Sequence, residues 1–246
     1  MVINHLFQYP TIEQIASFVT SEQVVIEQGL VEGPVKLTPI QRDFFERITT
    51  DRHHWNQARM LFCRDGLERE WVVETLDALV LQHDALRMRF RETEQGIVQF
   101  HQGNEGKLFG LRVFDCTEEL DLARKVEEKA NELQAGMNLQ EGPLVQAALF
   151  MTRTGDHLLL AIHQLIVDDA SWRIILEDFQ TAYKQKAAGE LIALPKKTHS
   201  YQSWAEELHS VANSKKLTSE LGYWRKIASS PTRPLPQDQE PLSRTE

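Results

Sequence analysis

One short stretch of the sequence holds residue types whose order is compatible with acid–base chemistry. Residues 161–172 read Ala-Ile-His-Gln-Leu-Ile-Val-Asp-Asp-Ala-Ser-Trp, so that His163 is followed by Asp168 and Asp169. The apolar run before His163 predicts a strand that ends at this histidine and passes into a loop with two carboxylates. Because loops on rigid scaffolds carry function and histidine titrates near neutral pH, His163 is a candidate general base. The alternative, which these residues alone favour, is a histidine that caps the strand by hydrogen bonding.

The elements around this stretch predict an α+β fold. Strands are expected at residues 56–63, 86–92, 97–101, 111–115, 144–152 and 157–163. Helices are expected at residues 68–83, 117–135, 201–211 and 216–228. A further helix should follow residue 170, where apolar side chains from Trp172 to Tyr183 share one face, and a short one should begin at Pro39 with Thr38 as its cap. The order lacks a strict βαβ rhythm and a glycine-rich phosphate loop, which argues against a nucleotide-binding sheet.

The composition is that of a globular chain with one or two domains. The 246 residues are 41% hydrophobic and 26% charged, and the net charge of −9 argues against a nucleic-acid-binding surface. Two cysteines, Cys63 and Cys116, make no disulfide framework, and no metal site is expected. The longest apolar stretch, residues 158–162, is far too short to span a membrane, and no signal peptide is visible. A cytoplasmic protein without a nucleic-acid or membrane partner is therefore expected.

Four segments are expected along the chain. Residues 1–21 hold an amphipathic helix that opens near Thr11, and a single helix must dock on another element to bury its apolar face. Residues 22–34 are expected to be a linker. Residues 35–228 are expected to form the folded lobe, and the proline-rich residues 229–246 a second linker or tail.

Several blocks of the sequence, in the same order, resemble the condensation superfamily of nonribosomal peptide synthetases, which includes epimerisation domains and chloramphenicol acetyltransferase. Residues 163–169, His-Gln-Leu-Ile-Val-Asp-Asp, resemble its motif His-His-x-x-x-Asp-Gly. Residues 170–178, Ala-Ser-Trp-Arg-Ile-Ile-Leu-Glu-Asp, resemble the continuation typical of epimerisation domains, and Trp172 lies in this block. The other matching blocks are residues 37–45, 53–57, 82–90 and 139–144.

The resemblance implies a fold, a function and partners. The fold would be a chloramphenicol acetyltransferase-like lobe, a mixed sheet with flanking helices. The lobe would be the N-terminal half of an epimerisation domain, which acts on an aminoacyl or peptidyl thioester held by a peptidyl carrier domain. No cofactor would be bound directly, because the phosphopantetheine arm belongs to the carrier domain. Residues 6–12 look like the last helix of a carrier domain, so residues 1–21 would end such a domain.

The chain departs from the family motif at two positions. The family's second histidine serves as general base, and Gln164 stands in its place, although an amide does not titrate near neutral pH. His163 is an improbable substitute because neighbouring side chains on a strand point to opposite faces. The family's glycine is Asp169 here, which adds bulk and charge at the channel. Asp168 is implied to be structural, with Arg87 as its expected partner, and the alternative is that Arg87 is a solvated charge at a strand end.

These departures favour a lobe without catalytic activity. The Glu-Gly-His-Gly-Arg-Glu motif of the family's second lobe does not occur in these 246 residues. The expected function is therefore a scaffold or carrier-docking surface within a synthetase, with the missing C-terminal lobe or a second copy of the chain as further partner. One alternative is an active epimerase completed by a second lobe, and another is an oligomeric acyltransferase. The sequence names neither the amino-acid substrate nor the peptide product.

Overall fold

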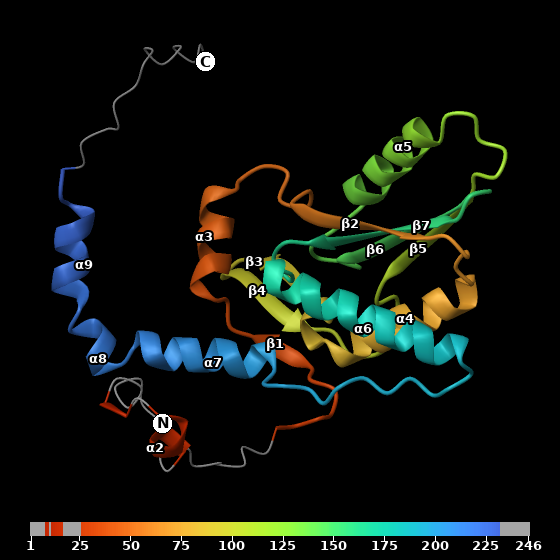
Figure 1. Ribbon diagram of the computed structural model, residues 1–246. Helices are drawn as coiled ribbons and strands as arrows, with labels where there is room; N and C mark the ends of the chain where they lie inside the picture. The colour runs from red at the N-terminus through yellow and green to blue at the C-terminus, as the bar shows by residue number, and fades with distance from the viewer. Residues whose placement is uncertain (1–7, 10, 17–25, 232–246) are drawn as a thin grey trace, which may run out of the picture.

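The computed structural model of the chain describes residues 8–9, 11–16 and 26–231. Most of the expected carrier-domain segment and nearly all of the proline-rich tail lie outside the described residues. Of the first expected helix, the structure describes α2, Ile12–Ala16, which begins next to Thr11. Figure 1 shows the described elements as a layered body from which α8 and α9 project at one end.

The main sheet has four strands in the order β2-β7-β6-β5. Its strands are β2 (Asn56–Cys63), β5 (Gly110–Asp115), β6 (Val145–Met151) and β7 (Asp156–His163). Strands β2 and β6 both pair antiparallel with β7, whereas β5 runs parallel to β6. The sheet is therefore mixed, and the long apolar strand β7 lies inside it with His163 at its last position.

A smaller antiparallel sheet lies beside the main one, with strand order β1-β4-β3. Its strands are β1 (Gly33–Val35), β3 (Met88–Thr93) and β4 (Gly96–His101). Strand β1 falls at the end of the expected linker, and it pairs with β4 from Gly33 opposite His101 to Val35 opposite Gln99. The chain before the lobe is thus attached to the lobe through backbone hydrogen bonds.

Helices cover both faces of the main sheet (Figure 1). The main helices are α3 (Pro39–Arg47), α4 (Arg69–Gln82), α5 (Leu122–Ala135), α6 (Asp169–Ala187) and α7 (Tyr201–Ala212). Strand β7 contributes side chains to two hydrophobic cores. Its even-numbered residues, such as Leu160, belong to the core that it forms with α4 and α6. Its odd residues, such as Leu159, join a smaller core with α5. The alternation follows from the pleat of a strand, and it explains why residues 158–162 of β7 are all apolar.

Three expected elements differ from those observed. The helix expected at 117–135 begins at Leu122, because Asp121 caps it by accepting a hydrogen bond from the Arg124 amide at 3.1 Å. The strand expected at 86–92 begins at Met88, because residues 84–87 form a 3-10 turn. The helix expected at 216–228 is two helices, α8 (Lys215–Thr218) and α9 (Leu221–Ala228), separated by a turn.

Candidate functional site

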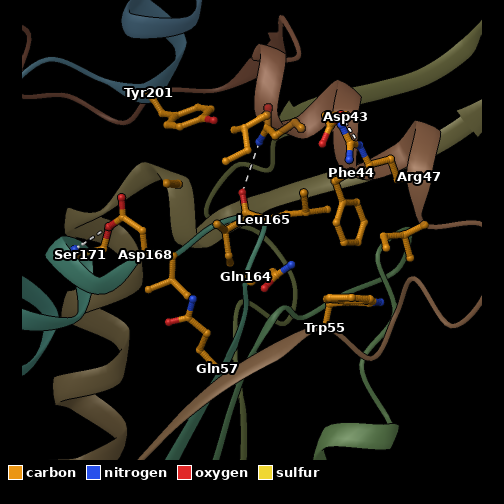
Figure 2. A pocket seen from close by; sticks show the side chains of 16 residues that line it. Asp43, Phe44, Arg47, Trp55, Gln57, Gln164, Leu165, Asp168, Ser171 and Tyr201 are labelled. Atoms are coloured by element: carbon orange, nitrogen blue, oxygen red, sulfur yellow. Dashed lines mark hydrogen bonds and ion pairs between the residues drawn. The ribbon is translucent and has the colours of Figure 1, made fainter. Parts of the chain in front are cut away.

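A cavity of about 510 Å³ opens where β7 ends and α6 begins. Helix α3 forms one wall, the β7–α6 loop forms another, and the first residue of α7 closes one side. Figure 2 shows Gln164 and Trp55 facing the open space, with Leu165 and Phe44 beside them. The cavity is therefore built around the stretch that the sequence singled out.

His163 does not line this cavity. Its side chain is fully buried, and its Nε2 lies 2.9 Å from the Arg52 carbonyl oxygen. Its Nδ1 accepts a hydrogen bond from the Leu165 amide at 3.2 Å, which assigns the proton to Nε2 and makes the ring neutral. Burial lowers the pKa of His163 to about 4. These contacts place His163 as a capping residue behind the strand, the alternative that its sequence context favoured.

Gln164 faces the cavity in place of His163. Its backbone amide donates to the Trp55 carbonyl at 2.8 Å, and this bond continues the pairing of β7 with the segment before β2. The side chain lines the cavity, and no hydrogen bond joins it to the other residues drawn in Figure 2. The amide group can donate and accept hydrogen bonds, but it cannot take up a proton near neutral pH.

The two aspartates of the motif have different environments. Asp168 is the N-cap of α6, where its Oδ1 accepts from the Ser171 amide at 2.8 Å and from the Ser171 hydroxyl at 2.5 Å. These hydrogen bonds lower the pKa of Asp168 below its ordinary value. Asp169 is exposed and lies 3.5 Å from the Arg59 guanidinium, away from the cavity lining. Asp168 thus holds the start of α6, and Asp169 pairs with a charge on the edge strand.

Arg87 is not the partner of Asp168. The fully buried guanidinium binds Asp84 at 2.6 Å and donates to the Val80 carbonyl at 2.5 Å. The 3-10 turn places Asp84 and Arg87 three residues apart on one side, which brings their charges together. Asp84 also accepts from Lys197 at 2.9 Å. The pairing expected from the resemblance is therefore corrected, and the observed pair depends on the 3-10 turn.

Trp172 is buried beneath the site and supports its wall. Its indole Nε1 donates to Gln57 Oε1 at 2.9 Å, and Gln57 lines the cavity. The Arg59 guanidinium lies 5.0 Å from the ring centroid, at cation–π distance. Trp172 therefore fixes Gln57 and the edge strand β2 relative to α6.

The sequence did not identify three residues that shape the cavity. Gln41 is buried and donates to the Leu165 carbonyl at 3.3 Å, which ties α3 to the loop after β7. Its Oε1 accepts from the Thr38 amide at 3.1 Å, so it also closes the N-terminus of α3. Phe44 and Trp55 form the aromatic side of the cavity. The only sequence signal for these three residues was that they lie in residues 37–45 and 53–57, two of the blocks that resemble the condensation superfamily.

The ionisable groups that line the cavity are already engaged. Asp43 and Arg47 form an ion pair of 2.6 Å, and Asp168 is bound by Ser171. Burial raises the pKa of Tyr201, whose hydroxyl lies 3.2 Å from the Thr38 hydroxyl. No histidine is among the lining residues in the described part of the chain. The cavity therefore offers apolar surface and a free amide, and no group poised to exchange protons at neutral pH.

Two other kinds of site were sought within the residues that the structure describes. No group of three or more histidine, cysteine, aspartate or glutamate side chains is placed to hold a metal ion. No described helix is both long enough and apolar enough to cross a membrane.

Comparison with solved structures identifies the fold. An epimerization domain from the third module of tyrocidine synthetase B is 43% identical with a TM-score of 0.82, over 86% of this chain and 49% of that one. A starter condensation domain of the rhizomide synthetase, in a mutant form, gives a TM-score of 0.71 at 19% identity, over 82% of this chain and 49% of that one. The expected α+β lobe of the chloramphenicol acetyltransferase type, a mixed sheet with flanking helices, is confirmed.

Comparison with curated proteins gives the family. Surfactin synthase subunit 1 of Bacillus subtilis (strain 168) is 46% identical over 96% of this chain, and tyrocidine synthase 1 of Brevibacillus parabrevis is 43% identical over 96%. The chain spans only 7% and 22% of the length of these two proteins. The family model described as Condensation domain matches residues 31–246. The chain therefore belongs to the condensation-domain family of nonribosomal peptide synthetases.

Proposed function

We propose that the chain is an epimerisation-type half-site that binds a carrier-tethered aminoacyl or peptidyl group and does not remove its α-proton. The observation that carries this proposal is which of two neighbouring side chains faces the cavity at the end of β7. The residue that faces the cavity is Gln164, while the neighbouring histidine, His163, is buried with both ring nitrogens bound to backbone groups.

The chemistry of epimerisation supports the absence of activity. Removal of an α-proton and its return on the other face need a base and an acid within reach of the carbon. The position that the resemblance assigns to the base carries an amide in Gln164. To act as base, His163 would have to leave its hydrogen bonds with Arg52 and Leu165, and with a pKa of about 4 it would hold the proton poorly at neutral pH.

The epimerisation type is favoured over peptide-bond formation by the degree of similarity. The solved epimerization domain shares 43% of its aligned residues with this chain, whereas the starter condensation domain shares 19%. The partner proposed for the cavity is a peptidyl carrier domain with its phosphopantetheine arm, because the curated relatives are peptide synthases many times longer than this chain. Residues 1–21 remain the predicted end of such a carrier domain.

An active epimerase is the second candidate. The observation that favours it is coverage, because the chain spans 49% of the solved epimerization domain that it resembles. A second lobe would then complete the site, with His163 or another group as base. The proposal above and this candidate differ in whether the completed site exchanges the α-proton, and the substitution Gln164→His shows whether position 164 can supply the base.

Docking is tested by titrating the chain with a fluorescent peptidyl carrier domain and measuring anisotropy. One carrier sample bears an L-aminoacyl group on its arm through a non-hydrolysable amide, and the other bears the bare arm. We expect the loaded carrier to bind about tenfold more tightly, equivalent to ~1.4 kcal/mol. Equal binding of both samples would show that the site does not recognise the aminoacyl group, and binding of neither would remove the docking role. Trp224→Ala, on the exposed face of α9 and outside the cavity lining, is the matched control and should leave both affinities unchanged.

A further inference from the structure

The lining of the cavity around Gln164 is mainly apolar and aromatic. Its apolar side chains come from α3 and the segment after it, from the residue before β2, and from the β7–α6 loop. The six that define the space are Ile40, Phe44, Ile48, Trp55, Leu165 and Val167. A volume of about 510 Å³ is ample for a large amino-acid side chain.

Trp55 gives this lining a fixed aromatic wall. Its side chain is 38% exposed, so one part packs inward and the rest faces the cavity (Figure 2). The ring meets Phe44 edge-to-face with centroids 5.8 Å apart, and Phe44 meets the buried ring of His163 in the same way at 6.0 Å. Phe44 also contacts Phe45 at 5.3 Å. Such edge-to-face contacts hold the rings in place before any ligand arrives.

The charged side chains that line the cavity are already paired and would stabilise a charged ligand little. The Asp43 carboxylate is satisfied by Arg47 at 2.6 Å, and the Asp168 carboxylate by Ser171. A charged ligand group would lose water on entering and would compete with these pairs. Gln164 provides a free amide that can bind a carbonyl or an amide of the ligand.

We infer that this cavity selects large apolar aminoacyl side chains and that Trp55 is the residue that determines the selectivity. The inference rests on the proposed function, because it names the class of carrier-tethered group that the half-site binds. The apolar side chain packs against Trp55 and Phe44, and the carbonyl of the tethered group receives the Gln164 amide. A short side chain leaves the aromatic wall in contact with water, and a charged one meets lining charges that are already paired.

The test uses a series of L-aminoacyl-pantetheine analogues in which an amide replaces the thioester. The side chains are those of phenylalanine, leucine, alanine, lysine and glutamate, and Kd is measured by isothermal titration calorimetry. We expect the phenylalanine and leucine analogues to bind about tenfold more tightly than the alanine analogue. The lysine and glutamate analogues should bind no more tightly than the alanine analogue.

Substitution of Trp55 measures how much the aromatic wall contributes to ligand affinity. Trp55→Ala should weaken the phenylalanine analogue about tenfold and change the alanine analogue less than about twofold. Trp55→Phe should restore most of the loss, because an aromatic face returns. The matched control is Trp224→Ala, since Trp224 is 55% exposed on α9 and lies outside the cavity lining.

A measurement on the unaltered chain keeps the test independent of any folding defect. In a two-dimensional NMR titration, the phenylalanine analogue should shift the indole signal of Trp55 and the methyl signals of Leu165 and Val167 through its ring current. If no analogue in the series binds, the proposed function itself fails. If all bind equally, or if Trp55→Ala weakens the alanine and phenylalanine analogues alike, the selectivity is refuted while the half-site stands.

Discussion

At the scale of single residues, the alternating direction of side chains along a strand determines which residue faces the cavity. Residues 163 and 164 are neighbours on the same strand end, so one side chain faces the cavity and the other does not. This outcome was predictable from the sequence, because the apolar run before His163 marks a strand. The partner of Arg87 was not predictable, because it depends on a 3-10 turn that brings Asp84 beside it.

Two buried histidines should make the fold sensitive to mild acid. Burial lowers the pKa of both His101 and His163 to about 4 from the ordinary 6.5. Around His101, Asp84 opposes this shift, whereas Arg87 and Lys197 add to it. The unfolded chain then binds protons that the folded chain rejects, so stability is complete above pH 6.5 and falls as the pH drops toward 4. Each histidine contributes up to about 3 kcal/mol to this loss.

Urea denaturation at a series of pH values between 7 and 4 measures this effect. His101 is the better residue to substitute, because neither of its ring nitrogens has a hydrogen-bond partner among the described residues. His101→Leu should remove about half of the pH dependence, because His163 remains, whereas substitution of the exposed His209 is the control. A free energy of unfolding that stays constant from pH 7 to 4 in the unaltered chain would contradict the account.

At the scale of elements, apolar periodicity located most helices and strands, and local caps set the ends that it missed. Helix α5 starts at Leu122 because Asp121 supplies the cap, whereas the predicted helix began at residue 117. Strand β1 was missed because its three residues, Gly33–Val35, carry no alternating pattern and pair only through the tertiary fold.

The turn before β6 should tolerate no side chain at Gly142. This residue has φ of +67°, and an added Cβ would collide with the buried guanidinium of Arg89. Gly142→Ala should lower the free energy of unfolding by about 3 kcal/mol, from backbone strain and the displaced arginine together. Gly189→Ala is the matched control, because φ there is +73° and nothing lies within 4 Å of the added atom. Equal losses in the two variants, measured by urea denaturation, would mean that Arg89 plays no part.

The segment before the lobe should depend on Asp84. This buried carboxylate binds Arg87 and Lys197, and it also accepts from the Val31 amide at 3.3 Å. Burial alone would raise the pKa of Asp84, but the hydrogen bonds from Arg87 and Lys197 lower it below its ordinary value. Asp84→Ala would leave two buried cations unpaired and should cost about 3–5 kcal/mol.

Amide hydrogen exchange at Val31 together with urea denaturation measures this loss. The control is Asp43→Ala, since the pair of Asp43 with Arg47 is exposed and should contribute less than about 1 kcal/mol. Val31 should exchange faster in Asp84→Ala and at an unaltered rate in Asp43→Ala. Unchanged protection of Val31 in Asp84→Ala would show that the segment is held by other contacts.

At the scale of the whole molecule, the sequence motifs predicted the family and the fold, and both are confirmed. The shape of the cavity was beyond the sequence, because its walls come from α3, from the segment before β2 and from the β7–α6 loop. The β7–α6 loop is far along the chain from the other two segments, and only tertiary packing places Trp55 and Phe44 beside Gln164. The charged side chains at the cavity are instead paired locally, Asp43 with Arg47 one turn along α3 and Asp168 with Ser171 at the start of α6.

The central claim is that the half-site binds without proton transfer. Its most direct test is incubation of the chain in heavy water with an L-aminoacyl group tethered to a carrier domain, followed by mass spectrometry for deuterium at the α-carbon. Gln164→His is assayed in parallel to show whether a base at this position restores exchange. The account predicts no deuterium above the carrier-only control in the unaltered chain. Exchange in the unaltered chain would contradict it and would make His163 the next residue to substitute.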